Sequence, residues 1–289
     1  MSSRPRGARA QALGWLLLGL VVVELASWQA VRQPVASLGT LALFALVAWI
    51  VLGRVLAAQE ERVQRTLASQ KEFIDDASHE LLTPLTIIRG HLELCGGDPA
   101  EREAAVEVVA DEVKRMTRLV DELRVLANTR RPDFLNPEPL DAGAVVREVF
   151  DKVRRLAPRD WRLESRDGGR LLGDRERLQQ ALINLAHNAV QYTREEDRIA
   201  IGASVDEHGA RLWVADTGPG VPEDEHDRIF ERFTCGAGGR RHPNSRGLGL
   251  AIVSAIARAH GGHVELNSAP GAGATFAIVV PELAHGGAR

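Results

Sequence analysis

The stretch from Ile74 to Ile88, IDDASHELLTPLTII, places a histidine among acidic side chains in a helical pattern, with a proline five residues later. Glu80 follows His79 directly, and its carboxylate can accept a proton from one ring nitrogen and leave a lone pair on the other. This arrangement makes a neutral imidazole nucleophilic near neutral pH. Pro84 lacks an N–H and crowds the carbonyl of residue 80, which predicts a kink beside the histidine.

Apolar residues around this histidine follow helical spacing. They recur every three or four positions, as on one face of a packed helix, at Ile74, Ala77, Leu81, Leu85, Ile88, Leu92 and Cys95. His79 lies two residues from both Ala77 and Leu81, about 200° round the helix, so we expect its ring to face solvent. Taken alone, such a histidine has a plainer interpretation as a core or surface residue without chemistry.

A second apolar seam follows GGDP at residues 96–99, which ends the first helix. Its members alternate steps of three and four, as in a coiled coil or helix bundle, at Val106, Val109, Val113, Met116, Val120, Leu123 and Ala127. Two helices alone would leave much of both seams in water. We therefore expect a homodimer in which two chains form an antiparallel four-helix bundle.

Residues 73–94, FIDDASHELLTPLTIIRGHLEL, resemble the phosphoacceptor box of sensor histidine kinases, whose usual core is SHELRTPL. The resemblance implies that His79 accepts a phosphoryl group with help from Glu80, and that Thr83 positions water for dephosphorylation of a partner regulator. The competing interpretation of Thr83 is a hydroxyl that happens to precede a proline. Leu82 stands where the family commonly has arginine, so a polar contact to the partner or to phosphate is in question.

The proline-rich stretch RPDFLNPEPL, residues 131–140, indicates a linker that opens a new domain. Helices are expected around 144–156 and from the N-cap Asp174 to about 191, with strand-like pieces near 161–164 and 170–172. RIAIGASV with ARLWVAD, and HVELNS with ATFAIVV, read as two hairpins. These elements predict an α/β sandwich, a mixed sheet with helices on one face.

Polar motifs in this half have the chemistry of a nucleotide site. Asn184 and Asn188 lie four apart on one helix face, with carboxamide oxygens suited to Mg²⁺. Asp216 ends an apolar strand in DTGPG, where a carboxylate can accept a hydrogen bond from a base amine and Gly218 and Gly220 permit close backbone approach. Each motif alone also has an ordinary explanation, as surface amides or a plain turn.

Two further stretches complete the pattern. RGLGLAIV begins a helix at Gly247 and Gly249, and first-turn N–H groups can receive phosphate oxygens. IFERF, residues 229–233, precedes a glycine- and arginine-rich segment that reads as a mobile lid, with a solvated loop as the competing interpretation.

In this order, the motifs resemble the GHKL-type ATP-binding domain shared by histidine kinases, type II topoisomerases, Hsp90-like chaperones and mismatch-repair ATPases. The resemblance implies a site for ATP and Mg²⁺ in which Asn184 and Asn188 hold the metal and phosphate. Tyr192 would lie against the adenine, and Asp216 would bind its exocyclic amine. The remaining residues that it places beside the nucleotide are Gly218, Gly220, Arg246, Gly247, Leu248 and Gly249.

Two positions depart from the usual GHKL pattern. Gln191 stands where many relatives have a lysine that contacts phosphate, and Ser245 with Arg246 stands where glycine and a small residue are common. Arg246 or Arg241 could supply the missing charge. The departures bear on lid contacts and rate rather than on ATP binding.

Two apolar runs precede the helical region, at residues 11–31 and 35–56. Each is long enough, at ~1.5 Å per residue, for the ~30 Å hydrocarbon core of a bilayer. Basic residues flank the pair on both outer sides, while the connection carries only Arg32, so both ends are expected in the cytoplasm. The alternative for the first run is a signal peptide, although Glu24 interrupts its apolar core.

The rest of the composition narrows the function further. Residues 57–73 have no glycine or proline and read as a continuing helix, too short for a relay domain. The net charge of −3 gives no reason to expect a nucleic-acid partner. Cys95 and Cys235 match neither a zinc spacing nor a disulfide framework, which indicates a reducing compartment.

The expected fold class is α+β, with two transmembrane helices, a dimeric antiparallel four-helix bundle and an α/β sandwich of the GHKL ATP-binding type. The domains would be a membrane hairpin at 1–57, a dimerisation and histidine phosphotransfer hairpin at 58–131, and a catalytic ATP-binding domain at 132–289.

The family resemblance implies an ATP-dependent protein-histidine kinase of a bacterial two-component system, multi-pass in the cytoplasmic (inner) membrane with its kinase domains in the cytoplasm. It would phosphorylate itself on His79 from Mg-ATP, pass the phosphoryl group to an aspartate of a response regulator, and also dephosphorylate that regulator. Its partners would be a second copy, the receiver domain and the lipid bilayer. The alternatives are a binding protein locked by nucleotide, or chiefly a phosphatase. The apolar runs and the helix around His79 argue against a DNA-acting or chaperone ATPase.

Overall fold

The computed structural model of the chain describes residues 34–94, 99–129, 131–165, 169–207, 209–234 and 247–281. The first predicted apolar run and Arg246 lie outside these residues. The chain divides into two compact units, residues 1–76 and residues 77–289.

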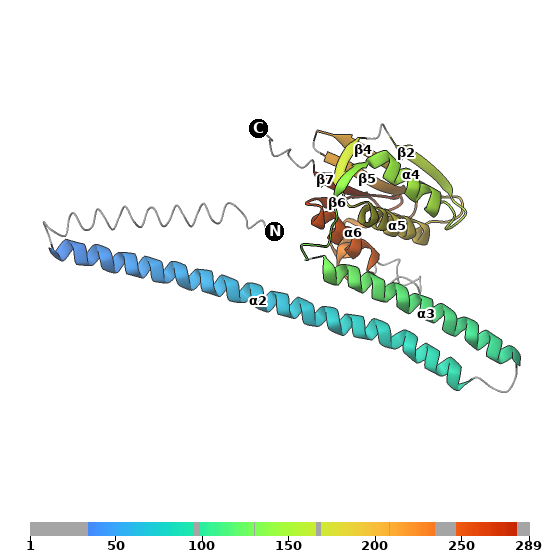
Figure 1. The fold of residues 1–289 in the computed structure, drawn as a ribbon, viewed down its shortest axis with the longest axis horizontal. Helices are drawn as coiled ribbons and strands as arrows, with labels where there is room; N and C mark the ends of the chain where they lie inside the picture. Colours follow the sequence, from blue (N-terminus) through green and yellow to red (C-terminus); the bar gives the residue numbers. More distant parts are fainter. Residues whose placement is uncertain are drawn as a thin grey trace. The chain divides into compact units, whose positions relative to one another are not determined.

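Helix α2 runs from Pro34 to Glu93 (Figure 1), and its second half contains His79 and the motif around it. The expectation that residues 57–73 form a continuing helix is therefore confirmed. Pro84 is buried, and the helix continues beyond it, so the kink stays a prediction. Among the helices of the described ranges, none is at once long enough and apolar enough to cross a membrane.

Helix α3, Pro99–Asn128, buries a different stripe from the predicted seam. Four of its buried residues lie seven apart, at Ala105, Glu112, Leu119 and Leu126, and Val125 beside the last of them is buried too. The seam residues Val106, Val113 and Val120 remain 65%, 49% and 51% exposed. The prediction missed the buried stripe because α3 also packs against a helix of the following domain, α6 (Gly249–Ala259). Apolar side chains left in water at heptad spacing are typical of a helix that pairs with a second chain.

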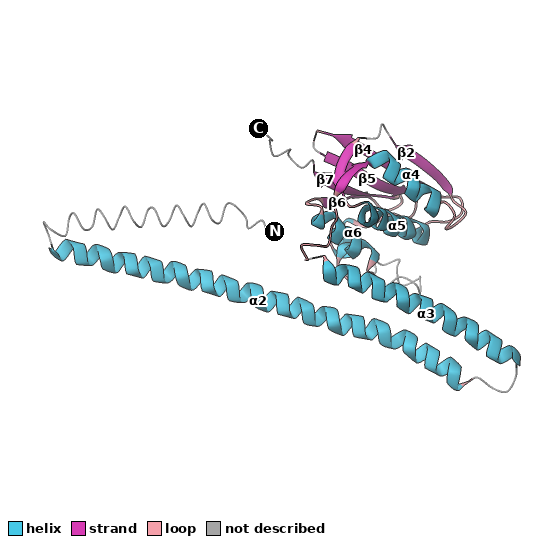
Figure 2. Ribbon diagram, viewed as in Figure 1, coloured by secondary structure: helices cyan, strands magenta, loops and turns pink. Residues whose placement is uncertain are grey.

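The remaining elements form a sheet domain, shown by element type in Figure 2. A five-stranded sheet has the order β2-β4-β5-β7-β6, in which β2 and β4 are parallel and the other neighbours are antiparallel. A separate antiparallel pair joins β1 to β3. The strands are β1 Glu138–Asp141, β2 Asp160–Ser165, β3 Arg170–Gly173, β4 Arg198–Asp206, β5 Gly209–Asp216, β6 His263–Ser268 and β7 Ala274–Pro281.

Three helices pack on this sheet, namely α4 (Ala142–Val153), α5 (Arg175–Tyr192) and α6 (Figure 1). Their buried aliphatic side chains meet those of the strands, and fully buried members of this core include Leu178, Leu182, Leu185, Ile199, Ile201, Leu212, Ile252, Ile256 and Ile278. Both predicted hairpins, β4 with β5 and β6 with β7, are confirmed, as is the α/β sandwich with a mixed sheet. Two short 3₁₀ turns, η1 (Glu223–Glu225) and η2 (Arg228–Phe230), follow β5.

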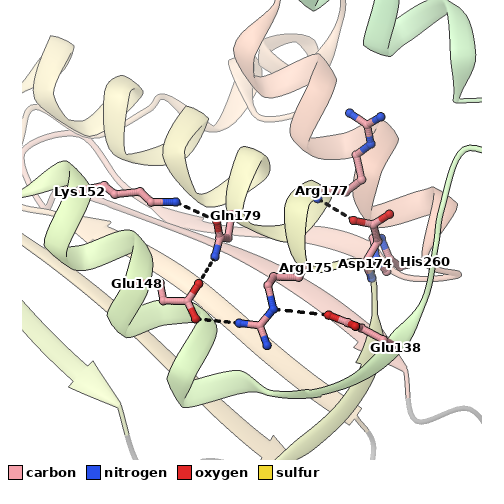
Figure 3. Close-up of polar contacts among 8 residues, drawn as sticks. All are labelled: Glu138, Glu148, Lys152, Asp174, Arg175, Arg177, Gln179 and His260. Carbon is pink, nitrogen blue, oxygen red and sulfur yellow. Dashed lines mark hydrogen bonds and ion pairs between the residues drawn. The ribbon is translucent and has the colours of Figure 1, made fainter.

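Asp174 caps α5, as its sequence position predicted. Its Oδ1 accepts the Arg177 backbone N–H at 3.0 Å and its Oδ2 accepts that of Asn136 at 2.8 Å. The Asp174 backbone N–H donates to Nε2 of His260 at 3.0 Å, and His260 Nδ1 lies 2.8 Å from the Ile256 carbonyl (Figure 3 shows Asp174, Arg177 and His260). Because Nε2 accepts, the ring is neutral and its proton sits on Nδ1.

A polar network beside this cap connects β1, α4 and α5 (Figure 3). Arg175 contacts Glu148 at 2.7 Å and Glu138 at 3.4 Å, while Lys152 donates to Gln179 at 3.0 Å. Gln179 in turn donates to Glu148. These groups are largely exposed, so the network should add little to the stability of the fold. Its main role is to align β1, α4 and α5.

The buried His260 predicts a pH-dependent stability. Burial lowers its pKa, against opposing effects of the Ile256 carbonyl and Asp174. The unfolded chain therefore binds more protons than the folded chain below about pH 6.5, and the free energy of unfolding should fall as the pH drops from 7.5 to 5.5. His260→Gln should reduce this slope in urea denaturation and cost about 1–3 kcal/mol at pH 7.5. His263→Gln, at an exposed histidine, should leave the slope intact; equal slopes in all three proteins would contradict the assignment.

Candidate functional site

His79 lies on α2 with its side chain exposed, as predicted, while Glu80 beside it is half-buried. Thr83 follows one turn later and is also exposed, and its hydroxyl donates to the His79 carbonyl at 3.3 Å. The imidazole is therefore accessible to a second domain or protein, with a carboxylate and a hydroxyl on neighbouring helix positions.

The nucleotide motifs converge on one cavity of about 990 Å³, lined mostly by the sheet domain. Helix α5, the segment after β5 and the start of α6 each contribute predicted residues to its lining, namely Asn184, Asn188, Tyr192, Asp216, Gly220, Gly247, Leu248 and Gly249. Gly218 is not part of this lining, but its backbone N–H donates to Asp216, which is. Arg246 lies outside the described residues. Segments more than 60 residues apart in sequence are thus brought together around one space.

Asp216 provides a carboxylate at the end of β5. Its Oδ1 accepts the backbone N–H of Gly218 at 2.9 Å. Burial raises the pKa of Asp216, and the Gly218 and Ala274 backbone N–H groups oppose that shift. A Cβ at position 218 would lie 2.9 Å from both this Oδ1 and the Tyr192 carbonyl, so glycine is required for the turn. The result is a partly desolvated acceptor that faces the cavity, which suits the exocyclic amine of adenine.

Gly220 and Gly247 have φ values of +73° and +65°, a region that favours glycine. A Cβ at Gly220 would lie 2.0 Å from the Ala269 carbonyl oxygen, and one at Gly247 would lie 2.5 Å from the Thr234 nitrogen. Backbone conformation and lack of space therefore explain why glycine occupies both positions. Gly249 has no such neighbour within 4 Å, so the start of α6 stays open toward the cavity.

Two buried amides lack partners at the cavity wall. Among the described residues, Asn184 Nδ2 and Gln191 Nε2 are buried side-chain nitrogens with no hydrogen-bond acceptor. A buried donor without an acceptor costs roughly 1–3 kcal/mol, and phosphate oxygens are acceptors of the kind that such donors bind. The residues therefore fit a phosphate-bearing ligand, and the carboxamide oxygens of Asn184 and Asn188 are of the type that binds Mg²⁺.

Several lining residues were missed by sequence reasoning. Arg115, Arg118 and Leu119 belong to α3, and no spacing pattern connects that helix with the cavity. Phe276 on β7 also lines it and packs edge-on against Phe230, with ring centroids 6.2 Å apart. Phe230 belongs to the IFERF motif, so that motif packs against the cavity lining.

Comparison with known proteins agrees with this geometry. Residues 69–131 match the family model described as His Kinase A (phospho-acceptor) domain. Residues 173–284 match the one described as Histidine kinase-, DNA gyrase B-, and HSP90-like ATPase. The chain belongs to the sensor histidine kinases.

Individual members of the family support the same assignment. This histidine kinase is 36% identical over 237 residues to the probable sensor histidine kinase TcrY of Mycobacterium tuberculosis, covering 80% of this chain and 50% of TcrY. The chain spans about half the length of the curated relatives it matches.

Two solved structures share the fold. Histidine kinase AdeS of Acinetobacter baumannii superposes with a TM-score of 0.55 and 28% identity over 70% of this chain and 98% of AdeS. Histidine kinase ThkA, solved in complex with the response regulator protein TrrA, gives 0.62 and 25% identity over 76% of this chain and 64% of ThkA.

Proposed function

We propose that this protein is a kinase that transfers the γ-phosphoryl group of Mg-ATP to His79 and then to an aspartate of a response regulator. The observation that carries the proposal is the pairing, in one chain, of an exposed His79 beside Glu80 with a cavity lined by Asp216 and unsatisfied amide donors. One group is a nucleophile and the other is a site for its phosphoryl donor.

The chemistry follows from the residues present. One neutral nitrogen of His79 attacks the γ-phosphorus, the bond from that phosphorus to the β–γ bridging oxygen breaks, and ADP leaves with its electron pair. Glu80 takes or holds the proton of the other ring nitrogen and so favours the imidazolium that forms. Asn184 and Asn188 would hold Mg²⁺, which neutralises phosphate charge when bound. Asp216 would orient the adenine.

The response regulator and the second copy of this chain are proposed partners. The ThkA relative was solved with a response regulator, and the His Kinase A match covers the helical hairpin. Apolar side chains exposed on both helices, among them Leu85 and Leu92 of α2 and Val113 of α3, supply a surface for dimerisation. The domains are proposed as 1–57, 58–131 and 132–289.

Membrane anchoring stays a prediction from the sequence. It rests on the apolar runs at 11–31 and 35–56, and is supported by the large apolar side chains that α2 exposes from Leu43 to Leu56. In cells, recovery of the chain from washed membranes would support a cytoplasmic-membrane location with cytoplasmic kinase domains. Recovery from the soluble fraction would contradict it.

A phosphotransfer assay tests the proposed function. The full chain incubated with γ-labelled Mg-ATP should acquire an acid-labile, base-stable label, and addition of a cognate receiver domain should move most of that label to the receiver. The second candidate is a phosphatase, which the exposed Thr83 hydroxyl one turn from His79 favours. If the chain binds nucleotide without becoming labelled, and a phosphorylated receiver loses its label faster in its presence, the proposed kinase function would give way to the phosphatase function. If the chain binds nucleotide but shows neither kinase nor phosphatase activity, the remaining alternative is a binding protein that nucleotide locks in one state.

A further inference from the structure

The cavity is not formed by the sheet domain alone. Arg115, Arg118, Leu119, Asp121 and Glu122, all on α3, line it together with residues of α5. Leu119 is only 1% exposed, and α3 packs against α6, so this part of α3 is held in place by apolar contacts. The helix that follows the phosphoacceptor helix is therefore part of the candidate nucleotide site.

The charges that line the cavity point to a role for the two arginines. Among its described lining residues, Arg115 and Arg118 are the arginine or lysine side chains, whereas four carboxylates also line it, those of Asp121, Glu122, Asp216 and Glu225. A nucleoside triphosphate is strongly anionic even with one Mg²⁺ bound. Guanidinium groups are the side chains best suited to bind phosphate oxygens, because their planar N–H donors match that geometry.

Both arginine side chains lie at the cavity, where they can bind phosphate oxygens. Arg115 contacts Glu112 at 3.3 Å, and the Glu112 side chain is 7% exposed, so the guanidinium is anchored at the cavity wall with further N–H donors. Arg118 follows three residues later, on the same helix face. The pKa of His187 on α5 is lowered, mainly by partial desolvation and to a smaller extent by the positive charge of Arg118. Much of the His187 side chain is nevertheless exposed.

The unsatisfied donors lie on α5, a second helix that lines the same cavity. Asn184 and Gln191 place unpartnered amide nitrogens on α5, while α3 contributes the two guanidinium groups. Donors from two helices around one space suit a ligand rich in oxygen acceptors. A polyphosphate has such acceptors on every side.

We propose that Arg115 and Arg118 of α3 bind the phosphate groups of the nucleotide, so that bound nucleotide connects the helical hairpin to the ATP-binding domain. This inference rests on the proposed function, since it assumes that the cavity takes ATP. It predicts that α3 contacts the phosphates of the nucleotide and not its base.

Nucleotide titration of the full chain tests the contact. Arg118→Gln and Arg115→Gln should each weaken Mg-ATP binding about tenfold, in line with the loss of one charged hydrogen bond of roughly 1.5 kcal/mol. Binding of adenosine, which lacks phosphates, should not change. The matched control is Lys114→Gln, because Lys114 is 72% exposed on the same turn of α3, pairs with Asp111, and does not line the cavity.

The outcomes separate this inference from the proposed function. If wild type binds Mg-ATP and both arginine variants bind it equally well, the contact is refuted while the kinase proposal stands. Equal weakening of ATP and adenosine would also refute it, because the arginines would then act on the fold of the site. If wild type binds neither ligand, both proposals fall.

Discussion

Replacing His79 with glutamine should reduce labelling of the protein by γ-labelled Mg-ATP to background, a loss of at least about a hundredfold. Glutamine has no nucleophilic ring nitrogen, so the phosphoryl acceptor is removed. Because the side chain is exposed on α2 and does not line the cavity, Mg-ATP affinity should remain within about twofold of wild type. Acid-labile label on the gel-separated protein and a parallel binding titration measure the two quantities.

The chain offers a matched control for this experiment. His91 is exposed on the same helix, twelve residues further on, and His91→Gln should keep full labelling. Label that persists in His79→Gln, or disappears in His91→Gln, would place the acceptor elsewhere.

Replacing Asp216 with asparagine should weaken Mg-ATP and adenosine binding alike by about a hundredfold or more. The carboxylate is the proposed acceptor for the adenine amine, and an amide NH₂ facing that amine would place two donors together. The same change should raise the stability of the ligand-free protein. Burial raises the pKa of Asp216, which means that the folded protein holds the ionised form at a cost, and asparagine removes this cost above that pKa.

The pH dependence follows with a defined sign. In wild type, ATP affinity should fall as the pH drops through the raised pKa of Asp216, because protonation removes the negative charge and converts one carboxylate oxygen into an O–H donor; in Asp216→Asn this dependence should vanish. Calorimetric titration and thermal unfolding without ligand measure both effects. Asp224→Asn makes the same charge change at an exposed site outside the cavity lining and should alter neither. Retained affinity in Asp216→Asn would exclude the proposed base contact.

The two arginine variants and these substitutions differ in which ligands they affect. Loss of Asp216 should weaken ATP and adenosine together, whereas loss of Arg118 should weaken ATP alone. His79→Gln should weaken neither. The three binding profiles therefore distinguish a residue that contacts the base (Asp216), one that contacts phosphate (Arg118) and the phosphoryl acceptor (His79).

Sequence reasoning succeeded where the signal is local. The Asp174 cap, the two hairpins and the exposure of His79 follow from side-chain chemistry and periodicity within a few residues, and the structure confirms each. It was incomplete at α3, where the predicted seam through Val113 describes one apolar face and the stripe through Leu119 is another. Both faces carry aliphatic residues at helical spacing, although the second also includes Glu112, and spacing does not say what covers either one.

The sequence by itself determined the chemistry: a histidine with an adjacent carboxylate, paired amides, a strand-end aspartate and a glycine-started helix, in an order that indicates phosphoryl transfer. Only the tertiary structure decided that Asp216, Asn184 and the start of α6 share one cavity, and that Arg115 and Arg118 of α3 line it too. The physical reason is that periodicity assigns residues to faces of their own helix or strand. Which faces meet is decided by packing between elements distant in the chain.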